Sequence, residues 1–224
     1  KKILMILFLL PLFIMCGDID RDNALDPKNP NSKIDQLILV ELFVNDSSGF
    51  DYCQHALEAI ENIKSRNDYS DEICVLEYHV ENAGWNDQYS LEECKSRYHE
   101  YVPLPTERGI PDAFFNGLIN RVQGASPENI EHRYLSALED LRNKESLFRF
   151  EAEKNVTGES FSLDVKIARL GGYGINDLEL QVVVFEDIGT LGHRYVVRKI
   201  FHEQAIDSMN QGDVKSFSFF RDFS

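Results

Sequence analysis

The chain reads GFDYCQHA from Gly49 to Ala56, between a strand-like run, Leu37 to Val44, and a helix-like run that follows. Disulfide exchange at such a strand–loop–helix junction needs two thiols, one to attack and one to resolve the mixed disulfide. Cys53 has no companion at Cys-x-x-Cys spacing, because Phe50 and Ala56 occupy the two positions where one could stand. The stretch therefore predicts the scaffold of a redox protein without ordinary dithiol turnover.

The composition is that of an ordinary globular protein, with 43% hydrophobic and 27% charged residues among 224. This length suffices for one large domain or two small ones. The formal net charge of −15 argues against nucleic acid as a partner, because phosphates attract Lys and Arg. A self-repelling acidic surface suits an exported protein.

Residues 1–15 have the pattern of an export signal, with Lys1 and Lys2 before an apolar run that ends at Met15. The run is short for a bilayer span and is followed by Cys16 and a polar segment. This order resembles a bacterial lipoprotein signal, which implies cleavage before Cys16 and a lipid on its sulfur. Phe13-Ile14-Met15 departs from the usual residues of that signal, and an uncleaved anchor is the alternative. Residues 16–35 are turn-rich and indicate a tether.

Residues 36–145 predict an α/β domain with the order β-α-β-α-β-β-α. Strands are indicated by apolar runs, and helices by apolar stripes, a capping pattern and a proline in the first turn. Pro111 opens a short strand that ends in an Asn-Gly turn, which is typical of a hairpin. The other expected elements are strands at 38–44, 73–80 and 118–123, and helices at 56–64, 90–101 and 126–143.

Residues 146–224 show no helical pattern. Strand-like runs alternate with glycine-rich or Asn/Asp-containing turns. These runs are Phe161 to Ile167, Leu178 to Phe185, Tyr195 to Ile200 and Ser216 to Phe223. We expect a separate all-β, Ig-like sandwich domain over this range.

The chain resembles the thioredoxin-like lipoproteins of the Omp28-like outer-membrane family. The likeness covers roughly residues 36 to 224 and rests on several short segments. They are Cys53 to Ile60, Leu76-Glu77-Tyr78-His79, Arg97-Tyr98, Gly109-Ile110-Pro111, Phe114-Phe115-Asn116-Gly117 and His193 to Arg198.

This resemblance implies a thioredoxin fold in which Cys53 is the second motif cysteine and Phe50 replaces the first, the nucleophile. It also implies that Pro111 follows a cis peptide bond and faces the cysteine loop. The implied location is the bacterial outer membrane, on its periplasmic side or at the cell surface. We expect a binding or structural role with an envelope or extracellular protein partner. The alternative is a monothiol oxidoreductase or isomerase that uses Cys53 opposite Pro111.

Three readings of Cys53 remain open. It could form a structural disulfide with Cys94, since exported compartments are oxidising. It could be a free thiol like Cys74 and Cys94. It could also be a catalytic thiol, activated by the helix N-terminus that follows it.

We expect no bound metal and no cofactor. The six histidines show no His-x-x-x-His spacing, and His79 is interpreted as a strand-end residue in a hydrogen-bond network. Trp85 lies in a loop, where it is either a partner contact or a cap on the core.

Overall fold

The chain divides into two compact units in the computed structural model. The α/β unit comprises residues 35–146 and 175–208, and the β unit comprises residues up to 34, 147–174 and 209–224. The structure describes residues 23, 25–29, 31–47, 49–82, 84–158, 160–172, 174–189, 193–201 and 204–222. The predicted signal peptide, residues 1–15, and the predicted lipidation at Cys16 lie outside these residues.

Strand β2 (Ile38–Val44) is the centre of the α/β unit. Its apolar side chains are buried on both faces of the sheet, which explains the nearly unbroken apolar run in the sequence. It pairs in parallel with β3 (Ile73–His79) and antiparallel with β4 (Asp112–Phe115). Beyond β4 lies β5 (Asn120–Gln123), joined to it through a turn in which Asn116 and Gly117 both have positive φ. The predicted hairpin is therefore present.

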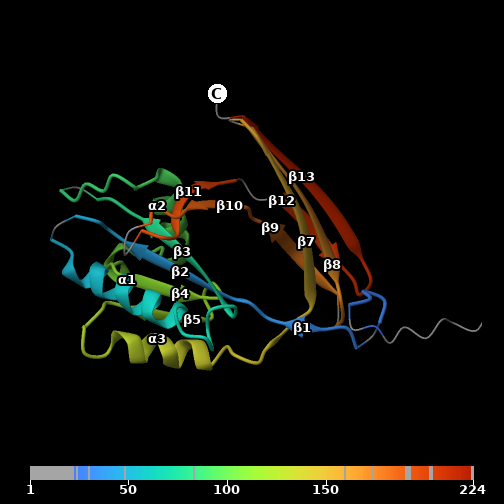
Figure 1. The fold of residues 1–224 in the computed structure, drawn as a ribbon, viewed down its shortest axis with the longest axis horizontal. Helices are drawn as coiled ribbons and strands as arrows, with labels where there is room; N and C mark the ends of the chain where they lie inside the picture. The colour runs from blue at the N-terminus through green and yellow to red at the C-terminus, as the bar shows by residue number, and fades with distance from the viewer. Residues whose placement is uncertain are drawn as a thin grey trace, which may run out of the picture. The chain divides into compact units, whose positions relative to one another are not determined.

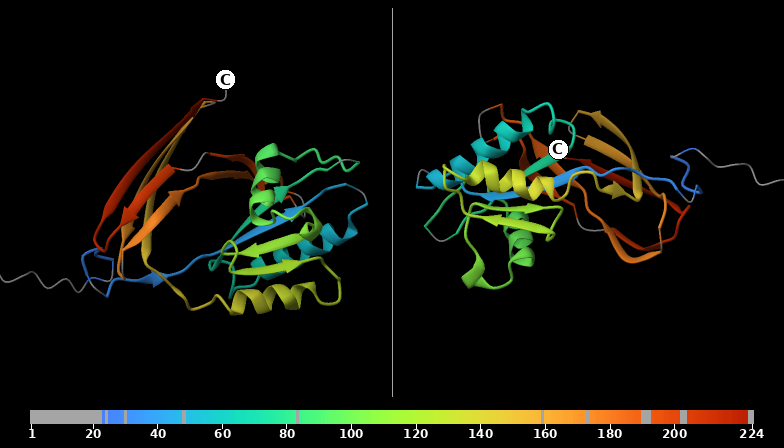
Figure 2. Two further views of the ribbon diagram at one scale, coloured as in Figure 1. Left: turned by 180° about the vertical axis from the view of Figure 1, so that it is seen from behind. Right: turned by 90° about the horizontal axis from the view of Figure 1, so that it is seen from below.

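Helices cover both faces of this sheet (Figure 1). Helices α1 (Asp51–Lys64) and α3 (Ile130–Glu139) pack side by side on one face (Figure 2). Helix α2 (Glu92–Tyr101) covers the other face. The order β-α-β-α-β-β-α, predicted from the sequence, is confirmed by these elements.

The apolar core has two parts, one on each face of the sheet. The first contains the buried sides of α1 and α3, including Cys53. The second contains the buried side of α2, including Cys94, together with Phe43 and Tyr78 from the strands. A buried carboxylate, Glu41 of β2, accepts hydrogen bonds from two side chains of α2, Arg97 (3.2 Å) and Tyr101 (2.5 Å).

The six-stranded sheet of the α/β unit contains two strands from the region that we expected to form a separate domain. The order is β10-β11-β3-β2-β4-β5, where β10 (Val183–Glu186) pairs antiparallel with β11 (Val196–Ile200). Strand β11 runs parallel to β3, and the backbone N–H of Glu77 donates to the carbonyl of Tyr195 (2.8 Å). The boundary predicted at residue 145 lies within one residue of the end of the first segment of the α/β unit. The prediction that 146–224 forms one domain is wrong, because residues 175–208 belong to the α/β unit. Strand β3 would otherwise be an edge with unpaired backbone groups, and β11 covers it.

The β unit contains a three-stranded antiparallel sheet of long strands, in the order β13-β8-β7 (Figure 1). Its members are β7 (Phe148–Thr157), β8 (Ser160–Arg169) and β13 (Val214–Asp222). Strand β9 (Ile175–Leu180) and nearly all of β12 (Gln204–Met209) belong to the α/β unit, where they pair as a two-stranded ladder. A short ladder pairs β1 (Ile34–Asp35) with β6 (Glu145–Ser146). Within the described part of the chain, no helix has the length and apolarity needed to cross a membrane.

Candidate functional site

The cysteine of the predicted redox junction is sealed inside the protein. Cys53 lies in the first turn of α1 and is only 1% exposed. Burial is the main cause that raises the pKa of its thiol to about 12; a hydrogen bond with the backbone of Asn45 lowers this pKa in part, and the charge of Asp87 adds to the increase. At neutral pH the sulfur is therefore a thiol and not the thiolate that attacks disulfides. The reading of Cys53 as a catalytic thiol, activated by the helix N-terminus, therefore receives no support from its surroundings.

The disulfide between Cys53 and Cys94, one of the three open readings, is not formed in this structure. Cys53, Cys74 and Cys94 are all free. Cys53 packs with α1 and α3, whereas Cys94 packs with α2 in the other part of the core. Burial also raises the pKa of Cys94 to about 12.

The predicted cis peptide bond is present between Ile110 and Pro111. Pro111 lies beside the start of α1, where it lines a small pocket with Tyr52. Cys53 does not line that pocket, because its side chain points into the core. Both residues of the predicted pair Cys53 and Pro111 are buried, and only the proline lines a pocket.

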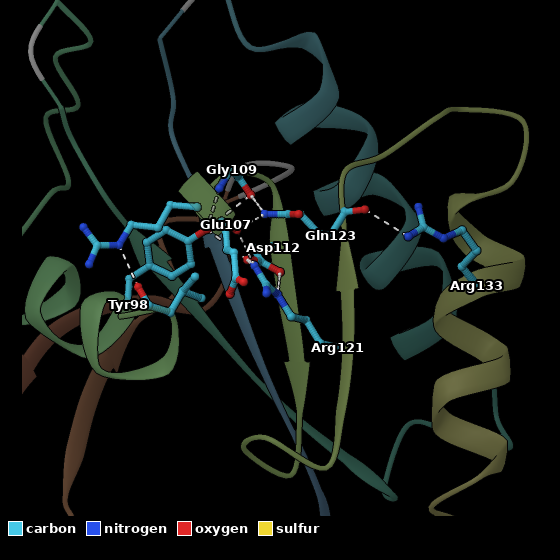
Figure 3. A network of polar contacts seen from close by, with 9 residues as sticks. Tyr98, Glu107, Gly109, Asp112, Arg121, Gln123 and Arg133 are labelled. Atoms are coloured by element: carbon cyan, nitrogen blue, oxygen red, sulfur yellow. Dashed lines mark hydrogen bonds and ion pairs between the residues drawn. The ribbon is translucent and has the colours of Figure 1, made fainter. Parts of the chain in front are cut away.

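A polar network holds the loop that carries Pro111 (Figure 3). The buried carboxylate of Asp112 accepts hydrogen bonds from Arg121 (2.6 Å) and from the hydroxyl of Tyr98 (2.9 Å). The same hydroxyl accepts the backbone N–H of Gly109 (2.9 Å). Gln123 Nε2 donates to the carbonyl of Gly109 (3.0 Å). The loop is thus fixed from α2, β4 and β5 together.

Next to this loop lies a pocket of about 360 Å³ with an aromatic wall. Phe50, at the position of the missing cysteine, meets Trp85 edge to face with ring centroids 4.7 Å apart. Val80, Tyr98 and Ile110 complete the apolar lining. The phenyl ring, at the position where the resemblance predicts a nucleophilic cysteine, therefore lines this pocket.

The rim of this pocket is more positive than the protein as a whole. Lys95 and Arg108 face it together with His99, and Glu81 is the acidic residue in the lining. Burial, then the charges of Arg108 and Lys95, lower the pKa of His99. The guanidinium of Arg108 is held by the carbonyls of Val102 (2.7 Å) and Pro103 (2.8 Å). Two cations against one carboxylate contrast with the net charge of −15 for the chain.

A second group of polar side chains lies at the ends of β3 and the segment before β11. One candidate ligand atom from each of Glu77, His79 and His193 lies within 4.8 Å of the others. Burial raises the pKa of Glu77 to about 7, partly opposed by the charge of His79 and by backbone hydrogen bonds. We did not anticipate this cluster, because His193 is distant in the sequence. The available signal was the pair Glu77 and His79, which are two apart on a strand and share a face.

The fold is similar to that of HBP35 of Porphyromonas gingivalis. The similarity has a TM-score of 0.55 at 14% sequence identity and covers 85% of this chain. The chain spans 64% of the length of HBP35, so the likeness concerns part of that protein. The chain matches no protein-family model and no curated protein sequence.

Proposed function

We propose that this protein is a lipid-anchored, non-catalytic binding protein of the bacterial cell envelope, with a thioredoxin-like domain that no longer exchanges disulfides. The observation that carries the proposal is the presence of Phe50 where the resemblance predicts the nucleophilic cysteine. An aromatic wall of Phe50 and Trp85 borders an open pocket, while Cys53 is buried and protonated. The N-terminal basic and apolar pattern before Cys16 supports the anchor.

The lining of the pocket defines the chemistry of its ligand. Phe50, Trp85 and Ile110 suit an apolar or aromatic group, and Lys95 and Arg108 suit an acidic group beside it. A ligand in which an apolar or aromatic portion lies next to an acidic group would satisfy both. It could belong to an envelope protein or be a small molecule. The resemblance to the Omp28-like family agrees with an outer-membrane location. We assign the β unit to docking on an envelope partner.

The monothiol alternative receives no support from the geometry. A nucleophilic thiol must be ionised and reachable. Cys53 is neither, since it is 1% exposed and its pKa is about 12. We therefore expect insulin reduction in the presence of dithiothreitol to proceed at the uncatalysed rate, and a clear acceleration that disappears in Cys53→Ser would contradict the proposal.

Binding is tested with 8-anilinonaphthalene-1-sulfonate, a dye that combines aromatic rings with one negative charge. Trp85 is the only tryptophan in the chain, so quenching of its fluorescence reports occupation of this pocket. We expect saturable quenching and an enhancement of dye emission. Trp85→Ala and Lys95→Gln should each lower the affinity for the dye about tenfold, as measured from the dye emission, since an aromatic contact or a charge is removed.

The matched control is Leu118→Ala, which removes an exposed apolar side chain outside the pocket. Its affinity for the dye should equal that of the unchanged protein. Equal affinities for Leu118→Ala, Trp85→Ala and Lys95→Gln would show that the dye binds elsewhere, and the pocket would lose its role.

Anchoring is tested by Cys16→Ser, which should release the protein from membranes.

A further inference from the structure

The cluster of Glu77, His79 and His193 contains three polar atoms without a hydrogen-bond partner. They are Glu77 Oε2, His79 Nε2 and His193 Nδ1, and all three are buried. Buried polar atoms in native proteins are nearly always paired, and each orphan carries a desolvation penalty. Three orphans in one place, with ligand atoms within 4.8 Å of one another, indicate a missing common partner.

The other nitrogen of each imidazole is already held by a carboxylate. His79 Nδ1 lies 2.8 Å from Asp87 Oδ2, and His193 Nε2 lies 3.3 Å from Asp46 Oδ1. A carboxylate only accepts, so His79 Nδ1 donates to Asp87. The carboxylate of Asp46 beside His193 Nε2 likewise favours the proton of that imidazole on Nε2. A neutral imidazole that donates from one nitrogen presents a lone pair at the other. The lone pairs of His79 Nε2 and His193 Nδ1 are therefore the ones in the cluster.

Asp87 is itself fixed, which gives the arrangement its rigidity. Its two oxygens accept the backbone N–H groups of Asp46 (2.8 Å) and Tyr89 (2.8 Å). The ring of Tyr89 also packs against both imidazoles, at 5.2 Å from His79 and 4.8 Å from His193. Histidines that bind metals are commonly oriented by a carboxylate on the remote nitrogen.

A cation satisfies these three acceptor atoms better than a water molecule does. A water donates two hydrogen bonds and would leave the third acceptor unmet. A divalent ion accepts electron pairs from all three atoms and also balances the charge of Glu77, which is 2% exposed. A zinc ion with bonds of about 2.0–2.1 Å holds its ligands roughly 3.4 Å apart, so ligand atoms that lie up to 4.8 Å apart would approach by up to about 1.4 Å on binding.

We propose that Glu77, His79 and His193 form a binding site for a divalent transition-metal ion, with two imidazoles and one carboxylate as ligands. This donor set suits zinc and leaves one position for water or a further ligand. The ion joins β3 to the segment that leads into β11. It therefore strengthens the attachment of these late residues to the sheet. The proposal does not depend on the pocket at Phe50.

The test uses the full chain, stripped with a chelator and then titrated with Zn²⁺ by calorimetry and with Co²⁺ by visible absorption. We expect one tight site per chain and the intense d–d absorption of four-coordinate Co²⁺. His193→Ala and Glu77→Gln should each weaken binding at least tenfold. Asp87→Asn should weaken it about tenfold as well, because the outer carboxylate orients His79.

His132→Ala is the matched control, since His132 is an exposed histidine outside the cluster. Its affinity should equal that of the unchanged protein. Glu77→Gln preserves the volume of the side chain and His193 is at the margin of the core, so far-UV circular dichroism should show folded variants. The absence of a saturable site in the unchanged protein would overturn the proposal. So would equal affinity in His193→Ala and His132→Ala.

Discussion

Two polar clusters of the α/β unit differ in how their buried groups are satisfied. In the cluster of Tyr98, Asp112 and Arg121, both oxygens of the buried carboxylate accept hydrogen bonds from protein groups. In the cluster of Glu77, His79 and His193, each residue keeps one buried atom without a partner. We call the first the closed cluster, because protein groups satisfy its buried carboxylate, and the second the open cluster, because each of its residues keeps an unpaired buried atom.

This difference separates a structural role from a binding role. A satisfied network orients the loop of Ile110 and Pro111 and needs nothing from outside. An unsatisfied one destabilises the chain until something fills it. Cys53 resembles the closed cluster in that it is not available to a ligand, because its sulfur lies in the apolar core.

The largest expected effect concerns the reactivity of Cys53. A pKa of about 12, against 9.0 for an ordinary cysteine, leaves about a thousandfold less thiolate at pH 8. Alkylation by iodoacetamide, followed by peptide mass spectrometry, should therefore be at least that much slower at Cys53 in the native protein than in urea. The rate should keep rising with pH beyond 9. Rapid labelling of Cys53 in the native protein at pH 8 would contradict this, because it would show that the thiol is accessible and ionised.

The next effect is on stability, when the closed cluster is broken. Asp112→Ala removes a fully buried carboxylate from Arg121 and Tyr98, and we expect a loss of about 3 kcal/mol in the free energy of unfolding. The loss stays at the lower end because Arg121 is partly exposed and can be rehydrated. Urea denaturation at pH 7 measures it. Asp68→Ala, which breaks an exposed pair with Arg66, should change stability by less than about 1 kcal/mol.

The open cluster should respond in the opposite direction. In metal-free protein at pH 8, Glu77→Gln should raise the free energy of unfolding by about 2 kcal/mol, since it removes a buried charge. The folded pKa of about 7 lies above the ordinary value of 4.5, so native stability is lost as the pH rises from 4.5 to 7 and the penalty is complete above pH 7. The gain should shrink to under about 1 kcal/mol near pH 5, where the native carboxyl is protonated. A destabilised Glu77→Gln protein at pH 8 would mean that the cluster is already satisfied without metal.

The smallest effect tests a single hydrogen bond of the closed cluster. Tyr98→Phe removes the hydroxyl that joins Asp112 to Gly109, and the expected loss is about 1 kcal/mol. Thermal unfolding measures it against Tyr52→Phe, a change at an exposed hydroxyl that should leave stability unaltered. If both variants unfold at the same temperature, the network does not hold the loop.

Local patterns in the sequence were enough for the order of elements in residues 36–145. The apolar run of β2, the stripe of α1 and the Asn116-Gly117 turn each reflect forces between residues that are close in the chain. The absence of a second cysteine beside Cys53 was also plain from the sequence alone, as was the acidic charge.

Only the tertiary structure decided where β11 pairs, which groups meet His79 and how deeply Cys53 is buried. Periodicity shows that a strand or helix has a face to bury, but it does not show what covers that face. The strand at Val196–Ile200 was recognisable, yet its place beside β3 depends on an edge that forms far earlier in the chain. For the same reason His193 reaches Glu77 and His79 only after folding, and the pKa of Cys53 follows from the packing around it.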